Sequence, residues 1–134
     1  MPRDIVIEPM GGREGQVLRT TLEDRINPTG QRFANPRYRL AIALTKNETP
    51  VVIEKDGTIR RYNVDYYSTF QLFDTVSGKQ IHSGKVKRSS SYNVLVREHF
   101  ATFVSQRDAA ERGLQELAED YRMRLANFFE GYGK

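Results

Sequence analysis

The sequence of 134 residues contains no cysteine and only two histidines. Without cysteine, disulfide bonds, thiolate catalysis and cysteine-based metal sites are all excluded. His82 and His99 have no second histidine at a metal-binding spacing, so a zinc site is not expected. Any function must therefore depend on other residue types.

Long apolar runs are also missing. No stretch of about 18 apolar residues is present, so no membrane-spanning helix is predicted. The first residues, Met1-Pro2-Arg3-Asp4, lack the apolar segment of a signal peptide. With 38% hydrophobic residues and a mean hydropathy of −0.63, the chain is expected to form one soluble globular domain over residues 1–134. Composition allows either a cytoplasmic protein or one whose targeting segment has been removed.

A recognisable catalytic set is absent as well. Ser89-Ser90-Ser91 lacks the G-x-S-x-G context of a nucleophile elbow, and Glu119-Asp120 is expected on the solvated face of a helix. Gly11-Gly12-Arg13-Glu14-Gly15 has neither the Walker ending nor the G-x-G-x-x-G spacing of phosphate loops. We therefore predict no enzyme activity, no cofactor and no metal.

Hydrophobic periodicity predicts the elements of the first half. Residues 4–8 alternate and are β-branched, as in a short strand, and from residue 13 the apolar spacing is helical until Asn27-Pro28. Residues 37–45 alternate between large and small side chains, which predicts a half-buried strand. Residues 46–57, with Pro50 near the middle, are expected to form a connection.

The second half begins with a predicted hairpin. Residues 59–74 form its first strand, and because aromatic residues occur at both parities, neither face is expected to be fully hydrated. Residues 74–79 form the turn, and residues 81–88 form the returning strand with a bulge at Gly84. The serines that follow are expected to form the exit from this strand.

A long amphipathic helix is predicted from about residue 97 to residue 132. Its apolar stripe consists of Phe100, Phe103, Val104, Leu114, Leu117, Ala118, Tyr121, Leu125 and Phe128. A capping box at Ser105-Gln106-Arg107-Asp108 suggests that the main helix begins there, after a shorter turn. The order is therefore β-α-β-β-β-α. It predicts an α+β two-layer sandwich with a four-stranded mixed, mostly antiparallel sheet covered by two helices. A right-handed crossover makes the first two strands parallel.

The charge balance favours cations, with 21 Lys and Arg against 17 Asp and Glu. In the predicted topology the connection 46–57 and the end of the fourth strand lie at the same end of the sheet. The cations expected at or near this end are Lys46, Lys55, Arg60, Arg61, Lys87, Arg88 and Arg97. They are either scattered solubilising charges or a tip that binds a polyanion.

Dispersed positions along nearly the whole chain resemble one protein family. They are Ile5-Val6-Ile7, Arg13-Glu14-Gly15-Gln16-Val17-Leu18-Arg19, Leu22, Tyr38-Arg39-Leu40, Phe73-Asp74, Gly78, Gly84, Ser91-Tyr92-Asn93, Phe100-Ala101-Thr102, Asp108-Ala109 and Arg124-Leu125. Together these positions resemble the LptE-type lipopolysaccharide-assembly lipoproteins of the Gram-negative outer membrane.

The resemblance implies a non-enzymatic role. Family members plug the large LptD β-barrel, help it assemble and assist delivery of lipopolysaccharide to the cell surface from the periplasmic side of the outer membrane. They share the β-α-β-β-β-α sandwich and bind lipopolysaccharide through basic residues. Lys55, beside Asp56-Gly57, lies where the family carries a basic residue in a turn and is the first candidate, with Lys87, Arg88 and Arg97 as weaker ones.

The sequence departs from the family at its start. Family precursors carry a signal peptide and a lipid-modified cysteine that anchors them in the inner leaflet of the outer membrane, whereas this sequence begins Met1-Pro2-Arg3. An anchor removed from the native precursor would explain the difference. The alternative function is a small basic α/β nucleic-acid-binding domain, motivated by a pI of about 9.5 and by aromatic residues on a sheet. No RNP-type signature is present and acidic residues interrupt the basic ones, so a nucleic-acid partner is not expected.

Overall fold

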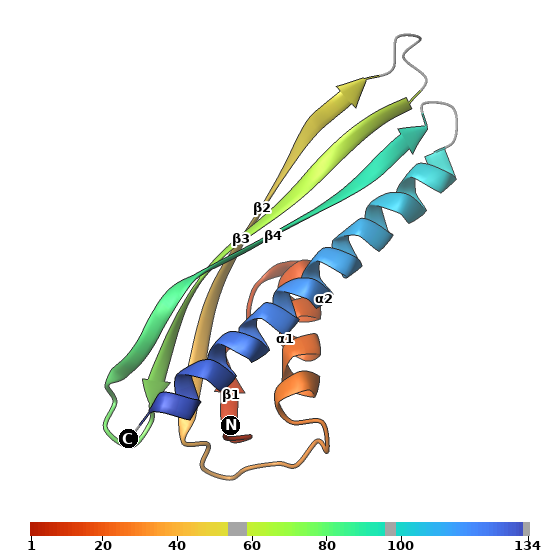
Figure 1. Ribbon diagram of the computed structural model, residues 1–134. Coiled ribbons are helices and arrows are strands. Elements are labelled where there is room, and N and C mark those ends of the chain that lie inside the picture. Colours follow the sequence, from red (N-terminus) through yellow and green to blue (C-terminus); the bar gives the residue numbers. More distant parts are fainter. Residues whose placement is uncertain (54–58, 96–98, 133–134) are drawn as a thin grey trace.

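The computed structural model describes residues 1–53, 59–95 and 99–132 and confirms the predicted order of elements (Figure 1). The elements are β1 (Ile5–Ile7), α1 (Gly12–Ile26), β2 (Tyr38–Ile53), β3 (Ile59–Asp74), β4 (Gln80–Leu95) and α2 (His99–Gly131). The strands form one sheet in the order β1-β2-β3-β4. As predicted, β1 is parallel to β2, and the other neighbouring pairs are antiparallel.

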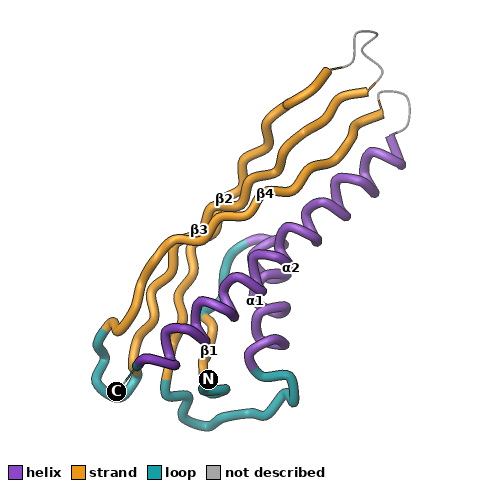
Figure 2. Tube along the Cα trace, viewed as in Figure 1, coloured by secondary structure: helices purple, strands orange, loops and turns teal. Residues whose placement is uncertain are grey.

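Both helices lie on one face of the sheet, which gives two layers (Figure 2). The helix α2 follows the sheet along its length, whereas β1 and α1 occupy only the half near the N-terminus (Figure 1). In the described part of the chain, no helix covers the opposite face, which we call the back face. Within the same residues, no helix is long and apolar enough to cross a membrane.

The strand alternation read from the sequence is confirmed. Even-numbered residues of β2 and β3 face the helices, and Leu40, Val64 and Leu72 are buried there. Leu18 and Leu22 of α1 are fully buried against the same core. One apolar face per element therefore suffices to build this core, because all helical cover comes from one side.

The prediction that residues 46–57 form a connection is wrong, because β2 continues to Ile53. Glu8 N donates to Leu40 O at 2.9 Å and Tyr38 N donates to Asp4 O at 3.2 Å, so the even-numbered peptide groups of β2 point away from β3. Pro50 has the same parity, and its missing N–H is not required by β3. The strand continues past the proline with a register shift between Pro50 and Val52.

The prediction that Ser89–Ser91 lie in a strand exit is also wrong, since they lie inside β4. Their hydroxyls have partners: Ser89 bonds Asp65, and Ser90 Oγ accepts from Arg112 Nη2 at 3.3 Å. This polar stretch remains a strand because neighbouring elements satisfy its side chains.

The bulge in β4 occurs at Ile81 and not at Gly84. Leu72 pairs with His82 and Phe73 with Gln80, so Ile81 has no counterpart in β3. Gly84 pairs regularly with Phe70, and a Cβ built there would lie 3.0 Å from Phe70 Cε1. The glycine therefore permits close packing of the Phe70 ring.

The helix α2 is continuous, so the predicted start at the capping box is wrong. Leu114, Leu117 and Leu125 of the predicted stripe are buried, but Phe103 is 55% exposed and Val104 is 40% exposed. The exposed part of the stripe lies where α2 extends beyond α1 (Figure 1).

Candidate functional site

The predicted basic cluster is only partly brought together by the fold. Two of its seven members, Lys55 and Arg97, lie outside the residues whose side chains the structure describes. The other five lie on β2, β3 and β4, at different heights and on both faces of the sheet.

Strand length is the reason for this dispersal. Lys46, Tyr66 and Arg88 form one row across the sheet. The ends of β2 and β4 lie seven residues further along each strand, which is about 23 Å at strand spacing. Lys46, Lys87 and Arg88 therefore lie mid-sheet, contrary to the prediction that places them at the tip. Arg60 and Arg61 do lie at that end, near the start of β3.

Lys46 faces the helices and is held by two carboxylates. Its Nζ lies 3.1 Å from Glu14 Oε1 of α1 and 3.5 Å from Glu48 Oε1 of β2. Desolvation opposes the charge of Lys46, but the bonds and charges of both glutamates outweigh it, so the pKa of the amine is raised. The pKa of Glu14 is lowered by a backbone hydrogen bond and then by Lys46. The lysine is thus already neutralised within the protein.

Arg88 is similarly committed, in this case to α2. Its Nε and Nη2 donate to the two carboxylate oxygens of Asp120 at 2.6 and 3.0 Å, and Glu116 lies 3.8 Å from Nη1. The bidentate bond to Asp120 raises the pKa of the guanidinium. Arg88 therefore fastens the sheet to the helix.

Of the remaining members of the basic cluster, Lys87 and Arg61 lie on the back face. Lys87 Nζ lies 5.0 Å from the centre of the exposed Tyr67 ring, and Arg61 Nη2 donates to Ser91 Oγ at 3.1 Å. Arg60, on the opposite parity, is exposed. The described members of the basic cluster are thus divided between the two faces of the sheet.

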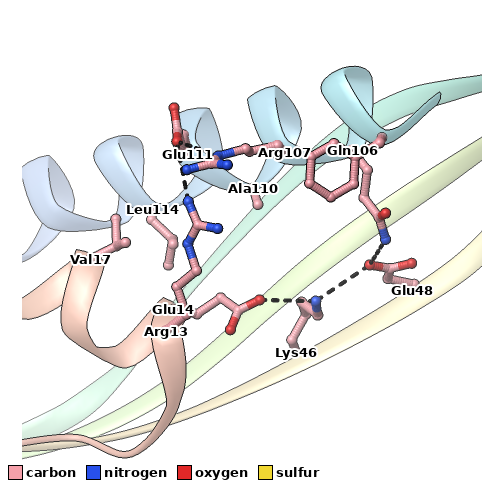
Figure 3. Close-up of a pocket in the computed structure, with 11 residues that line it drawn as sticks. Arg13, Glu14, Val17, Lys46, Glu48, Gln106, Arg107, Ala110, Glu111 and Leu114 are labelled. Atoms are coloured by element: carbon pink, nitrogen blue, oxygen red, sulfur yellow. Dashed lines mark hydrogen bonds and ion pairs between the residues drawn. The ribbon is translucent and has the colours of Figure 1, made fainter. Parts of the chain in front are cut away.

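A groove between α1, α2 and β2, with a volume of about 200 Å³, was not predicted (Figure 3). Its apolar walls are Val17, Phe103, Ala110 and Leu114. Its charged and polar groups are Arg13, Glu14, Lys46, Glu48, Gln106, Arg107 and Glu111. Only long-range proximity assembles these residues, and no local spacing in the sequence indicates the groove.

The charges of the groove neutralise one another. Arg107 Nε lies 3.5 Å from Glu111 Oε1, and Arg13 Nη2 lies 3.9 Å from the same oxygen. Together with the Lys46 pairs, these contacts join three cations to three carboxylates. Among the described residues, no group of three or more acidic or histidine side chains is placed to hold a metal ion. The groove is therefore unsuited to a strongly anionic ligand.

Tyr66 is fully buried in the same row of the sheet as Lys46. Within the described part of the chain its hydroxyl has no hydrogen-bond partner. Burial, followed by the negative charges of Glu14 and Glu48, raises the pKa of Tyr66 to about 12. By contrast, the buried Tyr121 hydroxyl donates to Ser68 Oγ at 2.7 Å. The two tyrosines form a natural comparison.

We expect Tyr66→Phe to raise the free energy of unfolding by about 1 kcal/mol, because it removes a desolvated hydroxyl that has no partner. Tyr121→Phe removes a satisfied hydroxyl and is expected to lower the same quantity by about 1 kcal/mol. Urea denaturation of both variants measures the difference. Equal losses in the two variants would show that the Tyr66 hydroxyl is bonded in solution.

Comparison with known proteins places the fold in context. No protein-family model matches this chain. The uncharacterized protein RP188 of Rickettsia prowazekii (strain Madrid E) is 27% identical over 125 residues, which cover 93% of this chain and 76% of that protein. The relationship extends along nearly the whole chain but brings no assigned activity with it.

Solved structures share the architecture. A candidate lipoprotein from Caulobacter crescentus CB15 superposes with a TM-score of 0.76 and 21% identity, over 96% of this chain and 92% of that one. The rare lipoprotein B from Shewanella oneidensis superposes with a TM-score of 0.66 and 12% identity, over 92% of each chain. At these identities the likeness shows that the fold is shared with these two proteins.

Proposed function

We propose that this protein is a non-enzymatic lipopolysaccharide-assembly protein of the LptE type. It plugs and helps assemble an LptD-type β-barrel, and it binds lipopolysaccharide during delivery to the cell surface. The observation that carries the proposal is the fold shared with rare lipoprotein B over 92% of both chains. The residues that resemble the family are a second, independent support. The native protein is then lipid-anchored on the periplasmic side of the outer membrane.

The back face suits a position inside a barrel. The groups between its cations include the small or neutral residues Ala41, Ala43, Thr69 and Ser83. Two aromatic rings on this face are partly covered by cations: Arg39 lies 4.3 Å from the centre of the Phe73 ring, and Lys87 lies over Tyr67. A shallow face of this kind can approach a barrel wall closely.

The environment of each cation ranks the candidates for binding lipopolysaccharide. Lys46 and Arg88 already have carboxylate partners, so phosphate groups would have to compete for them. Arg60 and Arg61 lie at the sheet end and have no ion pair among the described residues, which favours them. Lys55 keeps its place as a candidate from the family resemblance.

The proposal is tested by co-purification with the LptD-type barrel of the same organism and by lipopolysaccharide binding. Replacing Arg60 and Arg61 together by Glu is expected to weaken lipopolysaccharide binding by at least about tenfold, because charge-assisted bonds to phosphate are lost. Lys79→Glu makes a charge reversal in the turn at the opposite end of the sheet and serves as the control, with a change below about twofold expected.

The proposal would be rejected if no barrel complex forms and if lipopolysaccharide binding is unchanged when Arg60 and Arg61 are replaced by Glu. Salt-sensitive binding to an unrelated oligonucleotide would instead support the nucleic-acid alternative.

A further inference from the structure

One edge of the sheet presents unpaired peptide groups. Even-numbered residues of β2 direct their N–H and C=O groups away from β3, and β1 pairs with β2 only from Tyr38 to Leu40. Beyond that point, no hydrogen bond within the described chain reaches the outward peptide groups of Ile42, Leu44, Lys46 or Glu48. Unpaired groups of this kind form a template for another strand.

The opposite edge of the sheet is formed by β4. The same alternation directs the odd-numbered peptide groups of β4 outward. Two arginines of α2 bond to them: Arg124 Nη1 donates to Lys85 O, and Arg112 Nη2 donates to Ser91 O at 2.9 Å. Side chains thus bond two outward carbonyl groups of the β4 edge, whereas no side chain bonds the outward peptide groups of the β2 edge in the described structure.

The open edge has defined limits. At one end β1 occupies it up to Leu40, and at the other Pro50 lacks the N–H that a further strand would need. Between these limits lie the outward groups of four residues, enough for a segment of about seven residues. A second copy of this chain pairing over so short a strand would bury far less than the roughly 1,200 Å² of a stable interface.

The groove lies beside this edge, since Lys46 and Glu48 belong to both (Figure 3). In a strand added to the edge, alternate side chains would point toward the helices and into the groove. Its volume of about 200 Å³ exceeds the roughly 150 Å³ that admits a benzene ring, so one large apolar side chain fits. Because its cations and carboxylates are paired, the groove suits a neutral segment.

We propose that the β2 edge from Ile42 to Glu48 binds an extended polypeptide segment of a partner protein by β-augmentation. The backbone of the segment pairs with the edge, and one apolar side chain fills the groove. This site is independent of the cations expected to bind lipopolysaccharide at the end of the sheet.

Selection of phage-displayed random dodecapeptides against the folded protein tests the inference. The best peptide is then synthesised in two forms, N-methylated at odd or at even positions. Only one parity can donate to the edge, so one form is expected to lose at least about tenfold in affinity while the other keeps most of it. Binding is also expected to slow amide exchange at Ile42, Leu44, Lys46 and Glu48.

A variant pair tests the same edge from the protein side. Lys46→Pro removes an outward N–H at a parity where Pro50 is already tolerated, and Lys46→Ala removes the side chain while keeping the N–H. The proline variant is expected to bind the selected peptide at least about tenfold more weakly than the alanine variant. Circular dichroism checks that both are folded, and if the proline variant is not, the N-methylated peptides decide. Failure to select any peptide, equal binding of the two methylated forms, or equal binding by two folded variants would overturn the inference.

Discussion

Leu117→Ala is expected to lower the free energy of unfolding by about 3 to 4 kcal/mol. Leu117 lies near the middle of α2 and is fully buried in the core between this helix and the sheet. Truncation to alanine loses the transfer free energy of the side chain and leaves a cavity that a rigid sheet closes only in part. A domain of this size has about 5 to 15 kcal/mol in total, so the midpoint of urea denaturation should fall clearly.

Phe103→Ala is the matched control on the same helix. Phe103 belongs to the same apolar stripe in the sequence but is 55% exposed, and the expected loss is less than about 1 kcal/mol. A loss of stability equal to that of Leu117→Ala would mean that the N-terminal part of α2, which contains Phe103, is covered in solution. The pair therefore tests the extent of the core and not merely its existence.

These two residues also show what periodicity reports. Spacing by three and four identifies the side of a helix that is apolar, and it predicted correctly that Leu117 and Tyr121 face the core. It carries no information on how far the partner layer reaches. Because α1 covers only half the length of α2, part of the stripe is left exposed (Figure 1).

The strands show the same division between local and distant information. Alternation was sufficient to assign the inward face of β2 and β3, since it depends on neighbouring residues only. The extension of β2 past Pro50 depends on which edge the strand occupies, and the polar stretch around Ser90 becomes a strand through partners on β3 and α2. Such partners are brought together only by the complete fold.

For the candidate site, the sequence shows which residues carry a charge, but it does not show which groups surround them in the fold. The described members of the basic cluster are at least partly exposed. However, Lys46 pairs with Glu14, 32 residues earlier in the chain, and Arg88 pairs with Asp120, 32 residues later. The open edge of β2 and its groove depend on where β1 ends and on how α1 and α2 diverge. No motif encodes that arrangement.

Gly113→Leu is expected to lower the free energy of unfolding by about 2 to 3 kcal/mol. Gly113 lies where α2 approaches β3, and a Cβ there would be 3.0 Å from Tyr66 Cε2 and 3.4 Å from Ser90 Cβ. Leucine gains about 1 kcal/mol in helix propensity but must displace the fully buried ring of Tyr66, and overpacking of this kind outweighs the gain. In Gly113→Ala the gain in helix propensity and the cost of a small displacement of the Tyr66 ring nearly cancel. Little change in the free energy of unfolding is therefore expected.

Gly131→Leu is the control that separates propensity from packing. Gly131 ends the same helix, and a Cβ there meets no atom within 4 Å. Stability is expected to stay constant or to rise by up to about 0.5 kcal/mol, because only the propensity contributes and the end of a helix realises part of it. If Gly113→Leu is tolerated as well as Gly131→Leu, the helix can move away from the sheet. The distance between α2 and the row of Lys46, Tyr66 and Arg88 is then not fixed, and the groove next to this row would vary in width. If Gly113→Leu alone is destabilising, the close contact between Gly113 and Tyr66 fixes the distance between the layers at the level of the groove.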